Sequence, residues 1–219
     1  MKVCTDACLF GSWLSANTTL SSTQSILDIG TGTGLLSLMM AQHSEALIDA
    51  VEIDKAAAEQ AKLNFEASPW KERLNLITGD VRKVAFTKKY DLVFSNPPFF
   101  ANHLKSEDNK RNLALHSEAL NLEDLLLVVV NVLIKEGRFA VLLPTHQAKD
   151  FEKMATAHAL YIDEKVWVKQ TAKHPWFRVF LLFSYQPCET VHSEITIKED
   201  SNNYSKELVE LLKDYYLFL

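Results

Sequence analysis

Residues 25–43 read SILDIGTGTGLLSLMMAQH. The stretch begins with a short, mostly apolar run that suits a buried strand and ends with a longer apolar run that suits a helix. Between the two, glycine occupies every second position, at Gly30, Gly32 and Gly34. Alternating glycines let the backbone turn tightly and let a ligand approach without a Cβ in the way. The stretch therefore predicts a strand, a ligand-contacting turn and a helix, although a merely tight turn would read the same way.

The rest of the chain repeats this alternation of strand and helix. Strands are expected at residues 25–29, 47–53, 74–77, 90–95 and 138–143, and helices at 34–43, 55–67 and 122–133. The last helix has Asn121 as its expected N-cap and Gly137 just past its end. Serial βα units with short loops predict an α/β fold, with a parallel sheet covered by helices on both faces. Residues 162–169 and 177–185 are close enough in sequence to form an antiparallel pair that closes one sheet edge.

Length, composition and charge limit the classes of protein to which the chain can belong. The chain has 219 residues, 47% of them hydrophobic, which suits a single domain over 1–219. It has no uninterrupted apolar run of about 18 residues and no signal-like N-terminus, so we expect a cytoplasmic monomer without a membrane segment. Cys4, Cys8 and Cys188 are expected as free thiols, and neither they nor the histidines have metal-ligand spacing. The net charge of −5 argues against a broad surface that coats nucleic acid.

Acidic residues stand at the ends of the predicted strands. In open parallel sheets ligands bind beyond the carboxyl ends of the strands, near the point where strand order reverses. Glu52 comes 22 positions after Gly30, close to the spacing at which an acid accepts hydrogen bonds from ribose hydroxyls. Asp80 follows the third strand and could accept from an exocyclic amino group; each acid alone could equally be a solvated loop carboxylate. A nicotinamide dinucleotide is disfavoured because the G-x-G-x-x-G pattern would need glycine where Leu35 stands.

The most specific motif is Asn96-Pro97-Pro98-Phe99, which ends the strand at residues 90–95. It resembles the N-P-P-[Y/F] motif of class I S-adenosylmethionine-dependent methyltransferases that methylate planar amino nitrogens. Prolines end the ladder, so the Asn96 side-chain oxygen and the Pro97 carbonyl can each accept an N–H of the target and direct the nitrogen lone pair at the methyl donor. Phe99 offers a face on which a base can stack, and Phe100 is expected to pack.

The sequence on either side of the motif narrows the choice of substrate. Residues 1–13, MKVCTDACLFGSW, resemble the opening of the bacterial tRNA adenine-N6 methyltransferases that modify valine tRNA beside the anticodon. Residues 68–73, 203–205 and 215–219 are similar to the same family, so the likeness covers nearly the whole chain. The N-P-P-F motif also occurs in enzymes that methylate protein glutamine N5, ribosomal guanine N2 or DNA adenine N6, and these stay open, as does a non-catalytic RNA-binding module.

The resemblance implies a Rossmann-like class I methyltransferase fold, with a mostly parallel seven-stranded sheet, an antiparallel edge pair and helices on both faces. It implies S-adenosylmethionine as cofactor and adenine 37 of valine tRNA as target. It divides the chain into a segment near the cofactor (1–24), a catalytic core (25–186) and a C-terminal extension (187–219). The catalytic residues it implies are Asn96, Pro97 and Phe99. The cofactor-binding residues it implies are Thr5, Asp6, Asp28, Gly30, Gly32, Gly34, Glu52, Asp80 and Asn96.

Contacts to RNA are expected from local positive charge. Lys105, Lys110 and Arg111 lie in the loop directly after the N-P-P-F motif, although each could be a solvated surface charge. A second basic group flanks the expected antiparallel pair and consists of Lys165, Lys169, Lys173, His174 and Arg178. Two departures from the family are expected to weaken tRNA binding: Leu115 precedes His116 where an Arg is usual, and the family's aromatic and basic segment before M-K-V is not present in this sequence.

Overall fold

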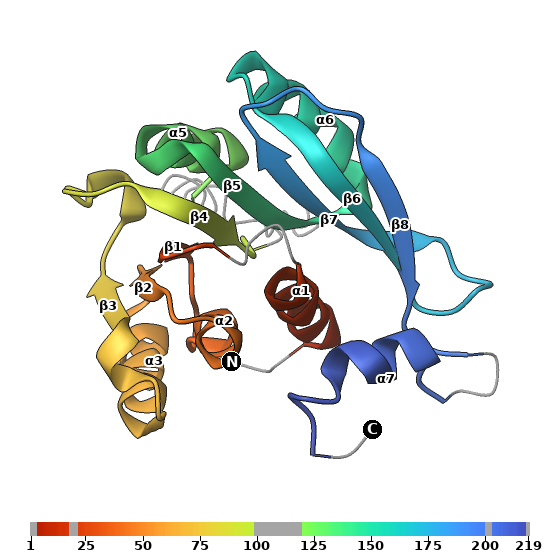
Figure 1. Cartoon of the computed structure of the whole chain (residues 1–219), viewed down its shortest axis with the longest axis horizontal. Coiled ribbons are helices and arrows are strands. Elements are labelled where there is room, and N and C mark those ends of the chain that lie inside the picture. The colour runs from red at the N-terminus through yellow and green to blue at the C-terminus, as the bar shows by residue number, and fades with distance from the viewer. Residues whose placement is uncertain (1–3, 18–21, 99–119, 200–202, 218–219) are drawn as a thin grey trace, which may run out of the picture.

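A computed structural model describes residues 4–17, 22–98, 120–199 and 203–217. These residues form an eight-stranded sheet in the order β3-β2-β1-β4-β5-β7-β6-β8 (Figure 1). The strands are β1 Ser25–Ile29, β2 Leu47–Glu52, β3 Leu74–Thr78, β4 Tyr90–Ser95, β5 Leu133–Pro144, β6 Tyr161–Lys169, β7 Trp176–Ser184 and β8 Val191–Thr196.

Strand direction is uniform except for β7. The strands β1 to β5 pair with one another in parallel, and β8 pairs in parallel with β6. The strand β7 lies between β5 and β6 and runs antiparallel to both, so β6 runs in the same direction as β5. The carboxyl ends of every strand but β7 therefore meet at one edge of the sheet.

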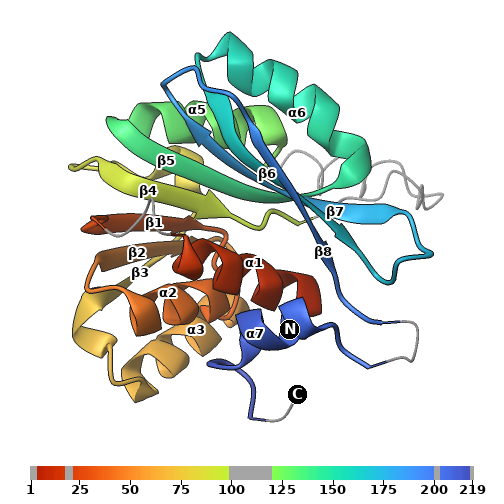
Figure 2. The same ribbon diagram turned by 45° about the vertical axis from the view of Figure 1, so that its right-hand side comes forward.

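Helices cover both faces of the sheet. They are α1 Thr5–Ala16, α2 Leu35–His43, α3 Lys55–Ala67, α5 Leu122–Val132, α6 Thr145–Ala157 and α7 Lys206–Leu212, with short 3-10 helices η2 Lys71–Arg73 and η3 Val81–Lys83. Figure 2 shows α1, α2, α3 and α7 on one face and α5 and α6 on the other. Each face has its own apolar core: one includes Phe10 of α1 and Phe94 of β4, and the other includes Phe139 of β5 and Phe151 of α6. The expected Rossmann-like α/β class with helices on both faces is confirmed.

Local sequence explains where the helices begin. Asp54 caps α3 by accepting a hydrogen bond of 2.8 Å from the Ala57 N–H, and Pro69 follows the helix end. Asn121 caps α5 in the same way, with 2.8 Å from its Oδ1 to the Asp124 nitrogen, as predicted. The apolar residues Leu125, Leu126 and Val129 then face the core and are fully buried.

The sheet, the set of helices and the place of Gly137 differ from the sequence prediction. The sheet has eight strands rather than seven because β8 adds to β6, so the antiparallel pair β6–β7 does not close the edge. The helices α1, α6 and α7 were not predicted. Gly137 does not follow a helix end: α5 stops at Val132, and Gly137 lies inside β5, where an added Cβ would come within 3.0 Å of the Asp91 carbonyl oxygen.

The two ends of the described chain meet. The helix α7 lies beside α1 in both ribbon views (Figures 1 and 2). The Ser15 hydroxyl lies 2.6 Å from the Tyr215 hydroxyl, and the Gln42 amide donates to the Asp214 carbonyl at 2.9 Å. The C-terminal segment therefore holds α1 and α2 together. In the described ranges, no helix combines the length and the apolar character that crossing a membrane requires.

Candidate functional site

The candidate site lies where strand order reverses. The strand β1 has β2 on one side and β4 on the other, and the chain builds outward from it in both directions. Ligands of open α/β sheets bind in the crevice at this point, beyond the carboxyl ends of the strands. The register pairs Ile29 with Ser95 at the two strand ends. Gly30 and Asn96 are the next residues of the two strands and therefore leave the sheet side by side.

Ser95 fixes this meeting point, and the sequence prediction missed it. Its hydroxyl donates a hydrogen bond of 2.8 Å to the Ile29 carbonyl, and the side chain is buried. A hydroxyl directly after the apolar run Leu92–Phe94 was the available signal, since a buried polar side chain needs a nearby partner.

The glycine loop needs glycine for two different reasons. Gly30 has φ +74°, and nothing lies within 4 Å of an ideal Cβ, so the loop presents open backbone on that side. Gly34 has φ +85°, and an added Cβ would lie 2.4 Å from a ring carbon of Phe65. Left-handed backbone of this kind is rarely adopted by residues with side chains. The first position leaves room for a ligand, and the second allows α2 and α3 to pack closely.

Asp28 is buried beneath the loop. Its Oδ2 accepts hydrogen bonds from the Thr31 hydroxyl at 2.6 Å and the Ser37 hydroxyl at 2.7 Å. Within the described residues, its Oδ1 is buried and has no hydrogen-bond partner. Burial raises the pKa of the Asp28 carboxyl to about 6, against the opposing effect of the two hydroxyls. The sequence prediction found Asp28 but not Ser37, whose signal is one hydroxyl within the apolar run of α2.

Glu52 supports the loop from the neighbouring strand. One carboxylate oxygen accepts the Gly32 N–H at 2.8 Å, and the other accepts the Asp54 N–H at 2.8 Å. The side chain is 8% exposed and stands at the carboxyl end of β2. Each carboxylate oxygen has two lone pairs, so both can accept a further hydrogen bond. The predicted role of Glu52 on a ribose is compatible with this position.

Asp80 follows β3 and forms a charged cluster. Its two oxygens accept from the Arg82 guanidinium at 2.9 Å each, and Arg82 also contacts Asp124 at 3.1 Å. Hydrogen bonding to Arg82 lowers the pKa of Asp80, which keeps it ionised at neutral pH. Its predicted contact with an adenine amino group would have to use its remaining lone pairs.

Thr5 and Asp6 begin α1 at the same edge of the sheet. Asp6 accepts a hydrogen bond of 2.8 Å from Arg178, which lies opposite Pro144 at the carboxyl end of β5. Further along α1, Gly11 approaches α2 so closely that an added Cβ would lie 2.7 Å from the Met39 sulfur. The first turn of α1 is thus anchored to β7 by an ion pair that the sequence prediction did not include.

The Asn96-Pro97-Pro98-Phe99 motif begins directly after β4. Asn96 is partly exposed, Pro97 is buried and Pro98 is exposed. The predicted site residues Phe99, Lys105, Lys110 and Arg111 lie outside the described residues, as do Phe100, Leu115 and His116. Their predicted roles remain predictions.

The chemistry of the donors and acceptors fits S-adenosylmethionine. This cofactor carries an ammonium, two ribose hydroxyls and an exocyclic amine, which all donate hydrogen bonds. The edge supplies acceptors in the unpartnered Asp28 Oδ1, Glu52 and Asp80, together with open backbone at Gly30 and at Gly79, where nothing lies within 4 Å of an ideal Cβ. As for metals, no group of three or more His, Cys, Asp or Glu side chains suited to an ion is found within residues 4–17, 22–98, 120–199 and 203–217.

Solved structures with the same fold are methyltransferases. A predicted O-methyltransferase from Agrobacterium tumefaciens superposes with a TM-score of 0.72 at 14% identity, covering 97% of this chain and 98% of that one. A putative RNA methyltransferase from Pyrococcus horikoshii gives 0.60 at 19% identity, covering 81% and 82%. At these identities the likeness shows the fold alone.

Sequence comparison is more specific. Residues 7–149 match the family model of the methyltransferase small domain. A tRNA1(Val) (adenine(37)-N6)-methyltransferase from Pectobacterium carotovorum is 39% identical over 223 aligned positions, covering 100% of this chain and 88% of the relative. Proteins of the same name from Trichodesmium erythraeum and Bacteroides thetaiotaomicron are 39% and 38% identical, covering 99% and 100% of this chain and 91% and 92% of theirs. The chain therefore belongs to the tRNA1(Val) (adenine(37)-N6)-methyltransferase family of methyltransferase small domain proteins.

Proposed function

We propose that this chain transfers a methyl group from S-adenosylmethionine to N6 of adenine 37 in valine tRNA. The observation that carries the proposal is the full-length relatedness to enzymes of that name, at 39% identity over the whole of this chain. The placement of Asn96 beside Gly30 at the switch point supports it, because a methyl acceptor and a methyl donor must meet.

The cofactor would be held by the loop and the strand-end acids. Thr5 and Asp6 would lie near its methionine end, Asp28 to Gly34 around its carboxylate and sulfonium, Glu52 at its ribose and Asp80 at its adenine. When bound, the cofactor supplies an activated methyl group on a positively charged sulfur. The buried position of Glu52 favours a strong charge-assisted hydrogen bond, since competing water is largely excluded.

The target nitrogen would be prepared by Asn96 and Pro97. An adenine amino nitrogen delocalises its lone pair into the ring and is a weak nucleophile. Two acceptors, the Asn96 Oδ1 and the Pro97 carbonyl, would take its two N–H groups and draw the nitrogen toward tetrahedral geometry. Its lone pair would then be free to form the new N–C bond as the S–C bond breaks, and the alkylated nitrogen would lose a proton to water. Phe99 would stack on the base.

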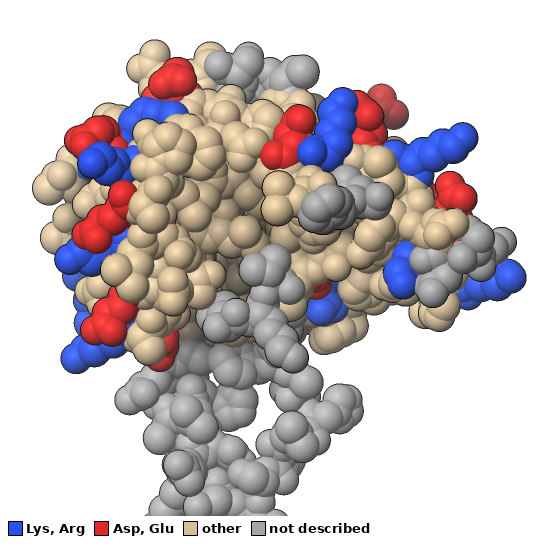
Figure 3. Space-filling view, turned by 90° about the horizontal axis from the view of Figure 1, so that it is seen from below, with Lys and Arg blue, Asp and Glu red and all other residues tan. Residues whose placement is uncertain are grey.

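Binding of tRNA would rest on few contacts. The formal charge is −5, and on the face shown in Figure 3 Lys and Arg are interspersed with Asp and Glu rather than forming a field of one sign. Lys105, Lys110 and Arg111 are the proposed phosphate contacts, so affinity should fall steeply as salt rises. The reaction is proposed for the cytoplasm, with a monomeric enzyme of a single domain over residues 1–219; light scattering after size exclusion tests the monomer.

The deciding experiment is methylation of defined tRNA. The purified chain is incubated with labelled S-adenosylmethionine and unmodified valine tRNA, and nucleosides from position-mapped fragments are identified by mass spectrometry. The proposal expects N6-methyladenosine at position 37 and no label in a transcript with guanine there. Label on guanine N2, on duplex DNA or on a glutamine of a protein substrate would assign another substrate. Binding of tRNA with no transfer to any of them would assign a non-catalytic RNA-binding module.

A further inference from the structure

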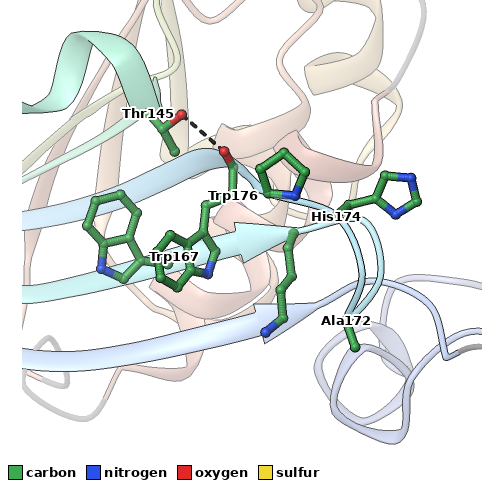
Figure 4. Close-up of a pocket in the computed structure, with 7 residues that line it drawn as sticks. Thr145, Trp167, Ala172, His174 and Trp176 are labelled. Atoms are coloured by element: carbon green, nitrogen blue, oxygen red, sulfur yellow. Dashed lines mark hydrogen bonds between the residues drawn. The ribbon is translucent and has the colours of Figure 1, made fainter.

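The hairpin of β6 and β7 carries a pair of tryptophans outside the methyl-transfer site. The ring centroids of Trp167 and Trp176 are 5.2 Å apart, with planes inclined at 33°. Trp176 is 48% exposed, which is unusual for so large an apolar side chain. Figure 4 shows the two indoles side by side, with Thr145, Ala172 and His174 around them. The cavity that these residues line has a volume of about 450 Å³.

The exposed ring is held in place from several elements. The Trp176 indole N–H donates to the Glu194 carboxylate on β8 at 3.3 Å, and its backbone carbonyl accepts from the Thr145 hydroxyl at 3.2 Å. Behind it, Trp167 packs against the core under α6, with the Lys165 ammonium 4.5 Å from its ring centroid. A ring fixed in this way loses little conformational freedom when a ligand stacks on it.

The same hairpin is locally basic. Residues 165–178 read KVWVKQTAKHPWFR, which contains four Lys or Arg and no Asp or Glu, in a chain of net charge −5. Among the described residues, Lys165 pairs with Glu152, Lys169 with Glu194 and Arg178 with Asp6. Lys173 and His174 are exposed at the turn. The hairpin thus combines an exposed aromatic face with exposed Lys173 and His174 side chains at its turn, where a phosphate can approach.

The hairpin turn lies at the same edge of the sheet as Asn96. The strand β6 runs parallel to β4, so Lys169 at the end of β6 and Asn96 after β4 leave the sheet on the same side. Three strand spacings separate β4 from β6, which is roughly 15 Å along the edge. Stacked nucleotides rise about 3.4 Å each, so a strand of RNA covers this distance in a few nucleotides.

We propose that Trp176, backed by Trp167, is a stacking platform for an unpaired nucleobase of the tRNA loop, a few nucleotides from the methylated adenine. The proposal rests on the proposed function, since it assigns a second contact to the same substrate. Single-stranded loops are recognised by stacking of splayed bases on aromatic rings, and an exposed indole beside cations supplies what such a base needs. A non-polar peptide is a poorer occupant, because it would gain nothing from Lys173 and His174.

The test compares Trp176→Ala with Trp176→Phe. Affinity for unmodified valine tRNA is measured in the absence of cofactor, and methylation kinetics and S-adenosylmethionine affinity are measured alongside. Trp176→Ala should weaken tRNA binding roughly 5- to 150-fold, the range expected for one stacked base. The KM of this variant for tRNA should rise, while its kcat and its affinity for S-adenosylmethionine stay unchanged. Trp176→Phe should restore most of the tRNA affinity. Leu63→Ala, which removes an exposed apolar side chain on α3 at the other end of the sheet, should leave all three unchanged.

The position of the contact is tested by ultraviolet cross-linking of the wild-type complex, followed by mass spectrometry of the linked peptide. A cross-link to residues 170–178 supports the platform. Equal tRNA affinity in Trp176→Ala and the wild type, or equal losses in the Ala and Phe variants, would overturn it. Weaker tRNA binding by Trp176→Ala, without any cross-link to residues 170–178 in the wild type, would overturn it as well. So would quenching of the Trp176 indole fluorescence by a peptide but not by tRNA. If the wild type methylates no adenine 37, the proposed function fails instead, whatever the Trp176 variants show.

Discussion

The Ser95 hydroxyl at the end of β4 donates a hydrogen bond of 2.8 Å to the Ile29 carbonyl at the end of β1. The residues that follow are Asn96 and Gly30, one proposed to hold the methyl acceptor and the other to border the cofactor. The same two strands are tied at their other ends, where the Ser25 hydroxyl donates to Asp91 at 2.9 Å. The chain therefore offers two serines that bridge the same pair of strands, one at the site and one away from it.

This pair gives a matched test of positioning. Ser95→Ala removes a buried hydrogen bond, so we expect the free energy of unfolding to fall by about 1 kcal/mol and the single-turnover methylation rate to fall as well. Ser25→Ala should cost a similar amount of stability while leaving the rate unchanged. Urea unfolding and rapid-quench kinetics measure the two effects. Equal rates in the two variants would show that the Ser95 bond has no role in positioning.

Asp28 should give the protein a pH-dependent stability. The pKa of this buried carboxyl is raised to about 6 from 3.8, so the folded state binds more protons than the unfolded state between these values. Stability should therefore fall as pH rises from 4 to 6 and then level off. Asp28→Asn removes this titration, so the variant should not lose this stability. From pH 4 to pH 7 its free energy of unfolding should therefore rise by about 3 kcal/mol relative to that of the wild type. Parallel pH profiles for the two proteins would contradict it.

Glu52 is predicted to serve both the loop and the cofactor. Glu52→Ala removes the acceptor of the Gly32 N–H together with the proposed ribose contact, so S-adenosylmethionine should bind roughly 5- to 150-fold more weakly, a loss of about 1–3 kcal/mol. Glu52→Gln keeps one acceptor oxygen and should lose less. Titration calorimetry measures both variants, with circular dichroism to check folding. Unchanged affinity would remove Glu52 from the site, and preferential binding of a nicotinamide dinucleotide would overturn the cofactor.

Asn96 is predicted to act on the rate rather than on cofactor binding. Asn96→Ala should lower the single-turnover rate at least ~100-fold, because its contact with the target nitrogen is strongest in the transition state. The affinity for S-adenosylmethionine should change by less than about twofold, because the contact with the target nitrogen is not yet made when the cofactor alone is bound. Asn96→Asp keeps acceptor oxygens and should retain more activity. A wild-type rate in Asn96→Ala would show that the motif does not align the nitrogen.

The sequence predicted the elements whose apolar pattern is clear. The strands β1 and β4 are short runs that are buried almost throughout, and such runs are recognisable without a structure. The edge strand β8 escaped because Val191–Thr196 is mostly exposed and has no apolar run. The helix α1 escaped for the opposite reason: residues 7–14 are all buried, between the sheet, α2 and α7, so the segment lacks the one-sided pattern of a surface helix.

For the candidate site too, the sequence predicted some residues and missed others. Positions at strand ends located Asp28 and Glu52, because parallel strands bring their carboxyl ends to one edge. Their partners depend on how distant segments meet, as with the bond between Glu52 and the backbone of Gly32. The ion pair of Asp6 with Arg178 joins residues 172 positions apart, and no local pattern in the sequence indicates it.

The place of β7 between β5 and β6 has a consequence for biosynthesis. A chain is made from its N-terminus, at about 5–20 residues per second, and β6 is made before β7. Until β7 has left the ribosome, β5 lacks its neighbour on that side and β6 has no native partner at all, since β8 comes later still. The helix α1 stays uncovered for longer still, because α7 and Tyr215, which cover it, are synthesised after β8. The nascent chain therefore carries unpaired strand edges until β7 and β8 emerge, and an uncovered apolar helix until α7 emerges.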